Sequence, residues 1–242
     1  AQIELGNLYA NGEGVPQDAQ KALELYQKAA AQNDANAYFF IAQMYLNGNG
    51  VEKDLQLAVK YYQTSADLGN IYSQGLLGIM YQYGEGVEED IDKAVELYTK
   101  SADKGNPFAQ YRLGKLYEDG IGVEQNDFKA FELYQKSADQ NNDDAQDALG
   151  YMYYIGKGCT ENHAMAFELY KKSAEQGNAS AQYHLGRMYE NGTGVSKDMN
   201  AATKWYQKAA ENGYAEAQFR LGLEENPLFK AAESGDVEAQ YL

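Results

Sequence analysis

The sequence predicts an all-α fold built from tandem helical repeats, and two observations carry this prediction. Gly-x-Gly followed by Val or Cys returns every 36 residues, beginning at Gly12, Gly48, Gly84, Gly120, Gly156 and Gly192. Within a repeat the apolar residues have helical spacing, as in Ala37, Ile41, Met44 and Tyr45, and no segment alternates like a β-strand. A fixed period of a few tens of residues is typical of arrays in which each repeat buries its apolar face on its neighbours.

Each repeat is expected to contain two helices. Numbering each repeat from 1 to 36, the first helix has Leu or Ile at position 5 and Tyr at position 9. The second has Ala at positions 22 and 30 and Tyr at position 26, which form one stripe. Gly follows position 5 in every repeat except the second, which has Ala42. Small residues let helices approach closely, and the Tyr rings fill the space between pairs, where each hydroxyl needs a hydrogen-bond partner.

An Asp or Asn at position 18 predicts where the second helix starts. These residues are Asp18, Asp54, Asp90, Asn126, Asn162 and Asp198. Asp and Asn are preferred N-caps because the side-chain oxygen accepts a hydrogen bond from a free backbone N–H. The second helix is expected to end at Gly or Asn, as at Gly69 and Gly177. The first glycine of Gly-x-Gly is expected to take a positive φ just past the first helix.

These features resemble the Sel1-like repeat, a relative of the tetratricopeptide repeat. The sixth repeat carries the family pattern at Ala181, Leu185, Gly186, Tyr189, Gly192, Gly194, Val195, Asp198, Ala202, Tyr206, Ala209, Ala210 and Gly213. The resemblance covers essentially the whole chain. It implies a right-handed superhelical solenoid of antiparallel helix pairs, with the first helices lining the concave side. It also implies an adaptor or scaffold for protein assembly, in bacteria often at the envelope or in host contact.

Two properties of cysteine-rich relatives are not carried over. Those members join the helices of each repeat by a disulfide, whereas this chain contains only Cys159. A β-lactam-binding or hydrolysing activity has been ascribed to some of them, and no residue of this chain supports its transfer.

The repeats predict a single elongated domain. It covers residues 1–222, with six repeats and the start of a seventh, and a truncated or capping repeat follows at 223–242. Leu221 fits the 36-residue period. Lys230-Ala231-Ala232 resembles Lys208-Ala209-Ala210 of the sixth repeat, but it comes 14 residues earlier than the period predicts. Both ends resemble cuts through an array, so targeting segments are expected to lie outside this sequence.

The net charge of −16 limits the classes of partner. Nucleic acids and anionic membranes are disfavoured, because both attract Lys and Arg. No apolar run approaches the roughly 20 residues of a membrane span. A basic partner would be steered toward the outer surface. The simpler interpretation is that the acidic groups solvate exposed faces.

The sharpest functional signal is a variable stripe at positions 4, 7 and 11 of the first helix, opposite the Leu and Tyr core face. The candidate partner-binding residues on it are Phe40, Gln43, Leu76, Ile79, Tyr83, Arg112, Lys115, Tyr151, Ile155, His184, Arg187 and Arg220. The stripe also contains Glu4, Asn7, Asn11, Asn47, Asp119, Ala148 and Asn191, which we do not select. Aromatic residues and Arg are the usual anchors of interfaces. We expect this strip to hold an extended or helical segment of another protein, whose acidic groups meet the arginines.

The alternative is that such side chains pack between neighbouring first helices. We expect packing for the residues at position 3, which are Phe39, Tyr111, Tyr183 and Phe219. Arg112, Lys115, Tyr151 and Arg187 are expected at the surface, since Lys and Arg are rarely buried without a partner.

The sequence argues against an enzyme and against a metal or cofactor site. His184 has no evident nucleophile near it in sequence, and His163 simply follows a helix cap. Cys159 replaces the Val of the other repeats and is expected to be a small core residue. Two His and one Cys do not make an ordinary zinc site without carboxylates. The glycines follow no strand and precede no Lys-Ser/Thr pair, as a phosphate loop requires.

Three functions stay open. The first is a scaffold that recruits other proteins, and the second is an immunity protein that neutralises a toxin enzyme through the concave face. The third and least supported is an amide or β-lactam hydrolase. We expect a monomer that binds another protein, located in the bacterial periplasm or envelope or in the cytoplasm.

Overall fold

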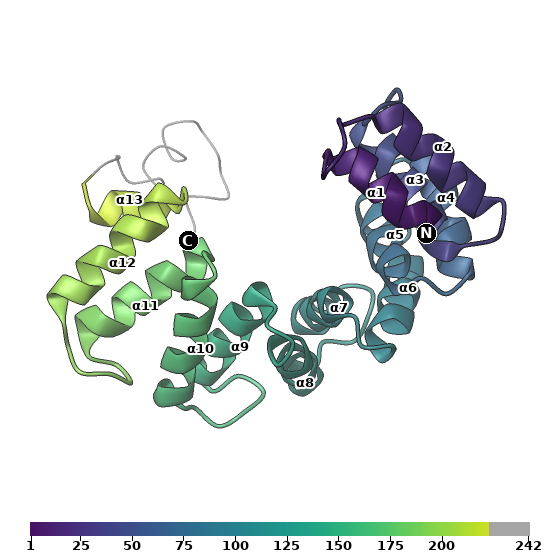
Figure 1. Cartoon of the computed structure of the whole chain (residues 1–242). Coiled ribbons are helices and arrows are strands. Elements are labelled where there is room, and N and C mark those ends of the chain that lie inside the picture. Colours follow the sequence, from purple (N-terminus) through teal and green to yellow (C-terminus); the bar gives the residue numbers. More distant parts are fainter. Residues whose placement is uncertain (223–242) are drawn as a thin grey trace, which may run out of the picture. The chain divides into compact units, whose positions relative to one another are not determined.

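The computed structural model describes residues 1–222, and every regular element in this range is an α-helix (Figure 1). The chain divides into two compact units, Ala1–Gln125 and Asn126–Leu242. The helices of the first unit are α1 (Gln2–Asn11), α2 (Ala19–Ala30), α3 (Ala35–Asn47), α4 (Leu55–Asp67), α5 (Ile71–Tyr83), α6 (Ile91–Asp103) and α7 (Pro107–Asp119). Those of the second are α8 (Asp127–Ala138), α9 (Asp143–Ile155), α10 (His163–Glu175), α11 (Ala179–Asn191), α12 (Met199–Glu211) and α13 (Ala215–Arg220). The all-α repeat fold is confirmed.

The two helices of a repeat run antiparallel. Ser65, near the end of α4, donates a hydrogen bond of 2.7 Å to the carbonyl of Ala35 at the start of α3. Ser101 makes the same bond to Ile71, at 2.6 Å, between α6 and α5. Both serines are fully buried. The bond therefore satisfies a hydroxyl whose desolvation would otherwise cost about 1–3 kcal/mol.

The N-cap prediction is confirmed in all six repeats. Each Asp or Asn at position 18 accepts a side-chain hydrogen bond from the backbone N–H three residues later. The cap residue also closes the loop through its own backbone, since the N–H of Asp90 bonds to the carbonyl of Tyr81 at 2.9 Å. Asp54 bonds to Tyr45 in the same way, at 3.0 Å. A cap of this kind stabilises a helix by about 1 kcal/mol.

The two glycines of each Gly-x-Gly have different roles. Gly84 ends α5 with a φ of 67°, and its N–H bonds to the carbonyl of Met80, as predicted for the first glycine. Gly86 has a φ of 73° and lies against the first residue of α4 in the preceding repeat. A Cβ on Gly86 would lie 2.6 Å from the carbonyl carbon of Leu55. The second glycine is thus a contact point between repeats, which the sequence did not predict.

The core is organised around the tyrosine at position 26. Tyr62, Tyr98 and Tyr134 are completely buried, and Tyr170 is nearly so. The glycine after position 5 makes room for this ring, because a Cβ on Gly78 would lie 2.7 Å from the Tyr98 ring. In this way the Gly and Tyr positions form one packing device within the helix pair.

One of these buried hydroxyls lacks a partner. Tyr98 donates to Oε1 of Gln82 at 2.8 Å, and Tyr206 donates to Oε2 of Glu190 at 2.6 Å. Both acceptors occupy position 10 of their repeats, where the second repeat has Leu46. In the first repeat, where position 10 is Ala10, Tyr26 donates instead to Asn7 at position 7. Within residues 1–222 the hydroxyl of Tyr62 finds no hydrogen-bond partner.

The seventh repeat begins with the short helix α13. The truncated or capping repeat predicted at 223–242 lies outside the described residues. In the described range, no helix combines the length and the apolar character needed to cross a membrane. The single-domain organisation and the right-handed sense of the superhelix stay predictions.

Candidate partner-binding site

Position 4 of the strip packs on the buried tyrosine of the preceding repeat. The ring of Phe40 stacks on Tyr26 with centroids 5.1 Å apart and planes 17° apart. The imidazole of His184 stacks on Tyr170 at 4.9 Å and 30°. Both side chains are half-buried. Position 4 is therefore a packing position between repeats as well as part of the strip.

Two of the predicted strip cations already have carboxylate partners. Nη1 of Arg220 lies 2.6 Å from both carboxylate oxygens of Glu190. Nζ of Lys115 lies 3.5 Å from Asp119. Both pairs are partly exposed, so each contributes little stability and exchanges readily with solvent or with another charged group.

Arg112 bridges two repeats. Its Nη1 donates a hydrogen bond of 3.5 Å to the hydroxyl of Tyr83, and its guanidinium lies 5.4 Å from the centre of the Phe108 ring. Its Nε is buried without a hydrogen-bond partner among the described residues. Arg112 is thus partly enclosed, whereas the sequence predicts a surface position.

Arg187 is the most available cation of the strip. It is exposed and lies 6.0 Å from the centre of the Tyr183 ring, and no carboxylate pairs with it in the described part of the chain. Tyr183 itself packs against Tyr206 and Tyr214, as expected for position 3. Phe219, for which packing is also expected, is instead 45% exposed.

The apolar strip residues divide by position. Tyr83, Tyr151 and Ile155, at positions 7 and 11, are 55%, 44% and 44% exposed. Leu76 at position 4 and Ile79 at position 7 are half-buried, and Leu76 packs against the core of α4 and α5. Among the candidate strip residues, the large apolar side chains that the structure leaves exposed are therefore Tyr83, Tyr151 and Ile155.

In the second compact unit, three candidate residues meet in one cleft. Tyr151, His184 and Arg187 line it together with three residues that sequence reasoning did not select, and its volume is about 40 Å³. The additional lining residues are Tyr154, Tyr170 and Met188. The cleft is aromatic on most sides and has one exposed cation at its edge.

In the first compact unit, Phe40 and Gln43 line a different groove, of about 520 Å³. Its other polar lining residues are Asn7, Asn11, Gln17, Asn47 and Asn49. Asn7, Asn11 and Asn47 belong to the variable stripe at positions 4, 7 and 11, but they are not among the candidate partner-binding residues. Gln17 and Asn49 belong to the loops that join the helices, where no pattern distinguishes them.

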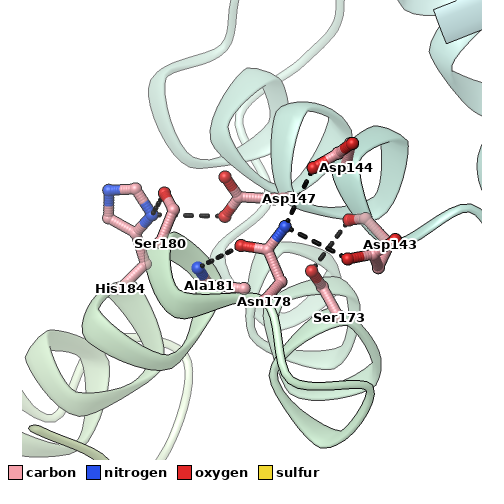
Figure 2. A network of polar contacts seen from close by, with 8 residues as sticks. All are labelled: Asp143, Asp144, Asp147, Ser173, Asn178, Ser180, Ala181 and His184. Atoms are coloured by element: carbon pink, nitrogen blue, oxygen red, sulfur yellow. Dashed lines mark hydrogen bonds and ion pairs between the residues drawn. The ribbon is translucent and has the colours of Figure 1, made fainter. Parts of the chain in front are cut away.

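The polar network around His184 is structural. Figure 2 shows Ser180 and Asp147 beside the imidazole, where Nδ1 lies 3.4 Å from Ser180 Oγ and 3.3 Å from Asp147 Oδ1. A catalytic Ser-His-Asp arrangement needs the hydroxyl and the carboxylate on opposite ring nitrogens. Here both face the same nitrogen, so the contacts fasten α11 to α9.

Asn178 extends this network to three helices. Its Oδ1 caps α11 by accepting from the N–H of Ala181, and its Nδ2 donates to Asp144 Oδ1 at 3.1 Å (Figure 2). Ser173 of α10 donates to the carbonyl of Asp143 at 2.8 Å. Every group in the network thereby serves helix packing.

The sequence predicts Cys159 to be a small core residue, but the structure leaves it partly exposed. Cys159 is half-buried, and its thiol lies 3.6 Å from the carbonyl of Met152, to which it donates. Burial raises the pKa of the Cys159 thiol, which lowers the fraction of reactive thiolate. Among residues 1–222, no cluster of His, Cys, Asp and Glu side chains is arranged to hold a metal ion.

Sequence comparison decides the family. The Sel1 repeat matches at residues 1–34, 35–70, 71–106, 107–142, 143–178, 179–214 and 215–227. The chain belongs to the Sel1 repeat family. Proteins of this family generally mediate protein–protein interaction and are typically not enzymes.

Solved structures support the Sel1 fold. A protective antigen of uropathogenic Escherichia coli, c5321, is 37% identical over 99% of this chain and 54% of its own, with a TM-score of 0.79. A Sel1 repeat protein of Oxalobacter formigenes is 33% identical over 92% of this chain and 65% of its own, with a TM-score of 0.80. This chain thus spans between about half and two thirds of the length of these two relatives.

A third similar structure is the immunity protein Pa5087 of Pseudomonas aeruginosa. It is 25% identical over 87% of this chain and 80% of its own, with a TM-score of 0.54. A comparison with curated proteins gave no match.

Proposed function

We propose that this Sel1 repeat chain is a protein-binding module that holds a segment of another protein on positions 7 and 11 of its first helices. The observation that carries the proposal is the exposure of Tyr83, Tyr151 and Ile155 at these positions. Burial of apolar surface contributes about 25 cal/mol per Å² removed from water. Tyr adds a rigid ring and a hydroxyl, so it anchors a partner at low entropic cost.

The charges along the strip limit the class of partner that we expect. Lys115 and Arg220 are paired with Asp119 and Glu190, whereas Arg187 is exposed at the edge of the aromatic cleft without a carboxylate. A partner carboxylate would bond to Arg187 without first displacing an acidic group of this chain. We therefore expect an acidic and apolar segment, with its carboxylate at Arg187 and its apolar side chain beside Tyr151.

The test is quantitative capture of the partner from a lysate of the organism that encodes the chain. The strip variant is Tyr151→Ala/Arg187→Glu. The matched control is Phe128→Ala/Lys136→Glu, which removes one exposed aromatic ring and reverses one exposed charge on α8. We expect the control to recover the partner like wild type and the strip variant to lose most of it, with equal helical circular dichroism. Equal recovery by both variants would refute the assignment to this strip of the second unit.

A second candidate is neutralisation of a toxin enzyme, favoured by the similarity to the immunity protein Pa5087. An immunity protein forms a tight 1:1 complex with one enzyme and abolishes its activity. A scaffold instead holds two or more different proteins at once. The mass and composition of the captured complex, followed by an activity assay of the partner, separate the two functions.

A further inference from the structure

We infer that the groove lined by α1, α3 and their Gly-x-Gly loops binds the main chain of an extended peptide segment. This inference rests on the proposed protein-binding function and adds the chemistry by which the segment is recognised. The groove has a volume of about 520 Å³ and contains six carboxamide side chains, Asn7, Asn11, Gln17, Gln43, Asn47 and Asn49.

The absence of charge in this groove is the first argument. None of its lining residues is ionisable apart from the phenol of Tyr26, although 23% of the chain is Asp, Glu, Lys or Arg. A neutral groove gives no charge-based preference for acidic or basic side chains. A carboxamide offers two N–H donors and one carbonyl acceptor, which match the carbonyl and N–H of a peptide group. The groove is therefore suited to binding the main chain of a peptide, whatever its side chains.

Several of these groups are available for a ligand. The carboxamides of Gln43, Asn47 and Asn49 form no hydrogen bond within residues 1–222. Asn7 is held in place because its Oδ1 accepts from the hydroxyl of Tyr26 at 2.7 Å, which leaves its NH₂ group to donate. Asn11 and Gln17 already donate, to Oε1 of Glu13 and to the carbonyl of Ala10, each at 2.9 Å. The groove thus combines one oriented donor with three unpaired amides.

The spacing of the amides fits an extended chain. Asn7 and Asn11 on α1, like Gln43 and Asn47 on α3, are four residues apart. Four residues advance about 6 Å along a helix. Two residues advance about 6.6 Å along an extended chain. Each helix therefore presents its amides nearly in register with alternate peptide groups.

The aromatic rings favour a peptide over a sugar. Carbohydrate recognition by an aromatic residue needs a free ring face. Phe40 stacks on Tyr26, and the ring of Phe39 meets Phe40 edge-on at 5.3 Å. Tyr26 is almost fully buried. Tyr26 and Phe40 line the groove, and their stacking covers one face of each ring.

The test uses linear peptides selected from a random library against the immobilised full chain, with affinities then measured by fluorescence anisotropy. The groove variant is Gln43→Ala/Asn47→Ala. The control is Gln20→Ala/Gln27→Ala, which removes two exposed carboxamides of α2 outside the groove. At about fivefold for each lost hydrogen bond, we expect affinity to fall by about 25-fold in the groove variant and to stay unchanged in the control.

Main-chain recognition has its own signature. N-methylation of alternate backbone amides of the peptide should weaken binding by about tenfold, because each methyl group removes a donor. Alanine substitution of the peptide side chains should have a smaller effect. The reverse ranking would overturn the inference.

Other outcomes overturn the inference in distinguishable ways. Peptides that keep their affinity for the groove variant but lose it for Tyr151→Ala/Arg187→Glu would move recognition to the second unit and leave the proposed function intact. Binding of an N-acetylglucosamine tetramer that is lost in the groove variant would make this a glycan groove. If no peptide is selected, the inference falls, and if the capture experiment also yields no partner, the proposed function falls with it.

Discussion

The imidazole of His184 stacks on the ring of Tyr170, with centroids 4.9 Å apart, and so joins the strip of one repeat to the core of the preceding repeat. Phe40 and Tyr26 form the same contact four repeats earlier. Position 4 thereby differs from the exposed side chains of Tyr83, Tyr151 and Ile155 at positions 7 and 11. This difference predicts which strip substitutions affect stability and which affect binding alone.

Phe40→Ala is expected to lower the free energy of unfolding by about 2–3 kcal/mol, because it removes a stacked, half-buried ring. Gln43→Ala, one helical turn later, is expected to change it by less than about 0.5 kcal/mol. Urea denaturation followed by circular dichroism measures both. Equal effects would show that position 4 is not a packing position.

Tyr62→Phe is expected to stabilise the chain by about 1 kcal/mol, because it removes a buried hydroxyl that has no hydrogen-bond partner. Tyr98→Phe should destabilise it by about 1 kcal/mol, because the carbonyl of Gln82 loses its donor. The two variants make the same chemical change in equivalent positions of the first unit. Thermal denaturation should therefore shift in opposite directions, and a shift in the same direction would contradict the account.

Leu46→Gln tests the same explanation by adding an acceptor. It places at position 10 the residue that accepts from Tyr98 in the next repeat. The gain in free energy of unfolding from Leu46→Gln should be about 1 kcal/mol larger in the wild-type chain than in the Tyr62→Phe variant. A double-mutant cycle measures this coupling, and zero coupling would show that the Tyr62 hydroxyl is not reached.

Gly86→Ala is expected to destabilise the chain by more than Gly14→Ala. Both glycines have a φ near 74°, where Ala costs about 1–2 kcal/mol. A Cβ on Gly86 would also collide with the Leu55 carbonyl, whereas a Cβ on Gly14 meets nothing within 4 Å. Comparison of the two denaturation midpoints isolates the contact between repeats, and equal midpoints would argue against it.

Alkaline pH is expected to destabilise the chain through its buried tyrosines. Burial raises the pKa of Tyr170 well above its ordinary value of about 10. Above that pH the unfolded chain releases the phenol proton while the folded chain retains it, so stability falls by up to about 1.4 kcal/mol per pH unit for each such tyrosine. In Tyr170→Phe, urea denaturation between pH 10 and 11 should show a shallower fall. An unchanged slope would contradict the assignment.

The local features of the fold were predictable because they depend on residues close in sequence. The Asp and Asn caps, the glycine at the end of the first helix and the Gly or Asn after the second all follow from backbone chemistry within a few residues. The roles of Gly86 and of position 4 were not predictable in this way. They arise where one repeat meets the next. The period of the sequence identifies the repeats, but it does not give the distances between residues of neighbouring repeats.

The candidate site was predictable only in part. Positions 7 and 11 could be selected because they vary while the core positions repeat. The ion pair of Arg220 with Glu190 could not, because the two residues are 30 positions apart on different helices. Gln17 and Asn49 enter the first-unit groove from loops, where neither periodicity nor a motif distinguishes them from solvated residues.

Site-specific photocrosslinking tests the binding strip most directly. A benzoylphenylalanine is placed at Tyr83, at Tyr151 or, as the exposed control, at Phe128. The chain is then irradiated with its captured partner. We expect a crosslinked product of the same partner from position 83, position 151 or both, and none from position 128. A product from position 128 alone would place the partner off the strip and contradict the proposed function as stated.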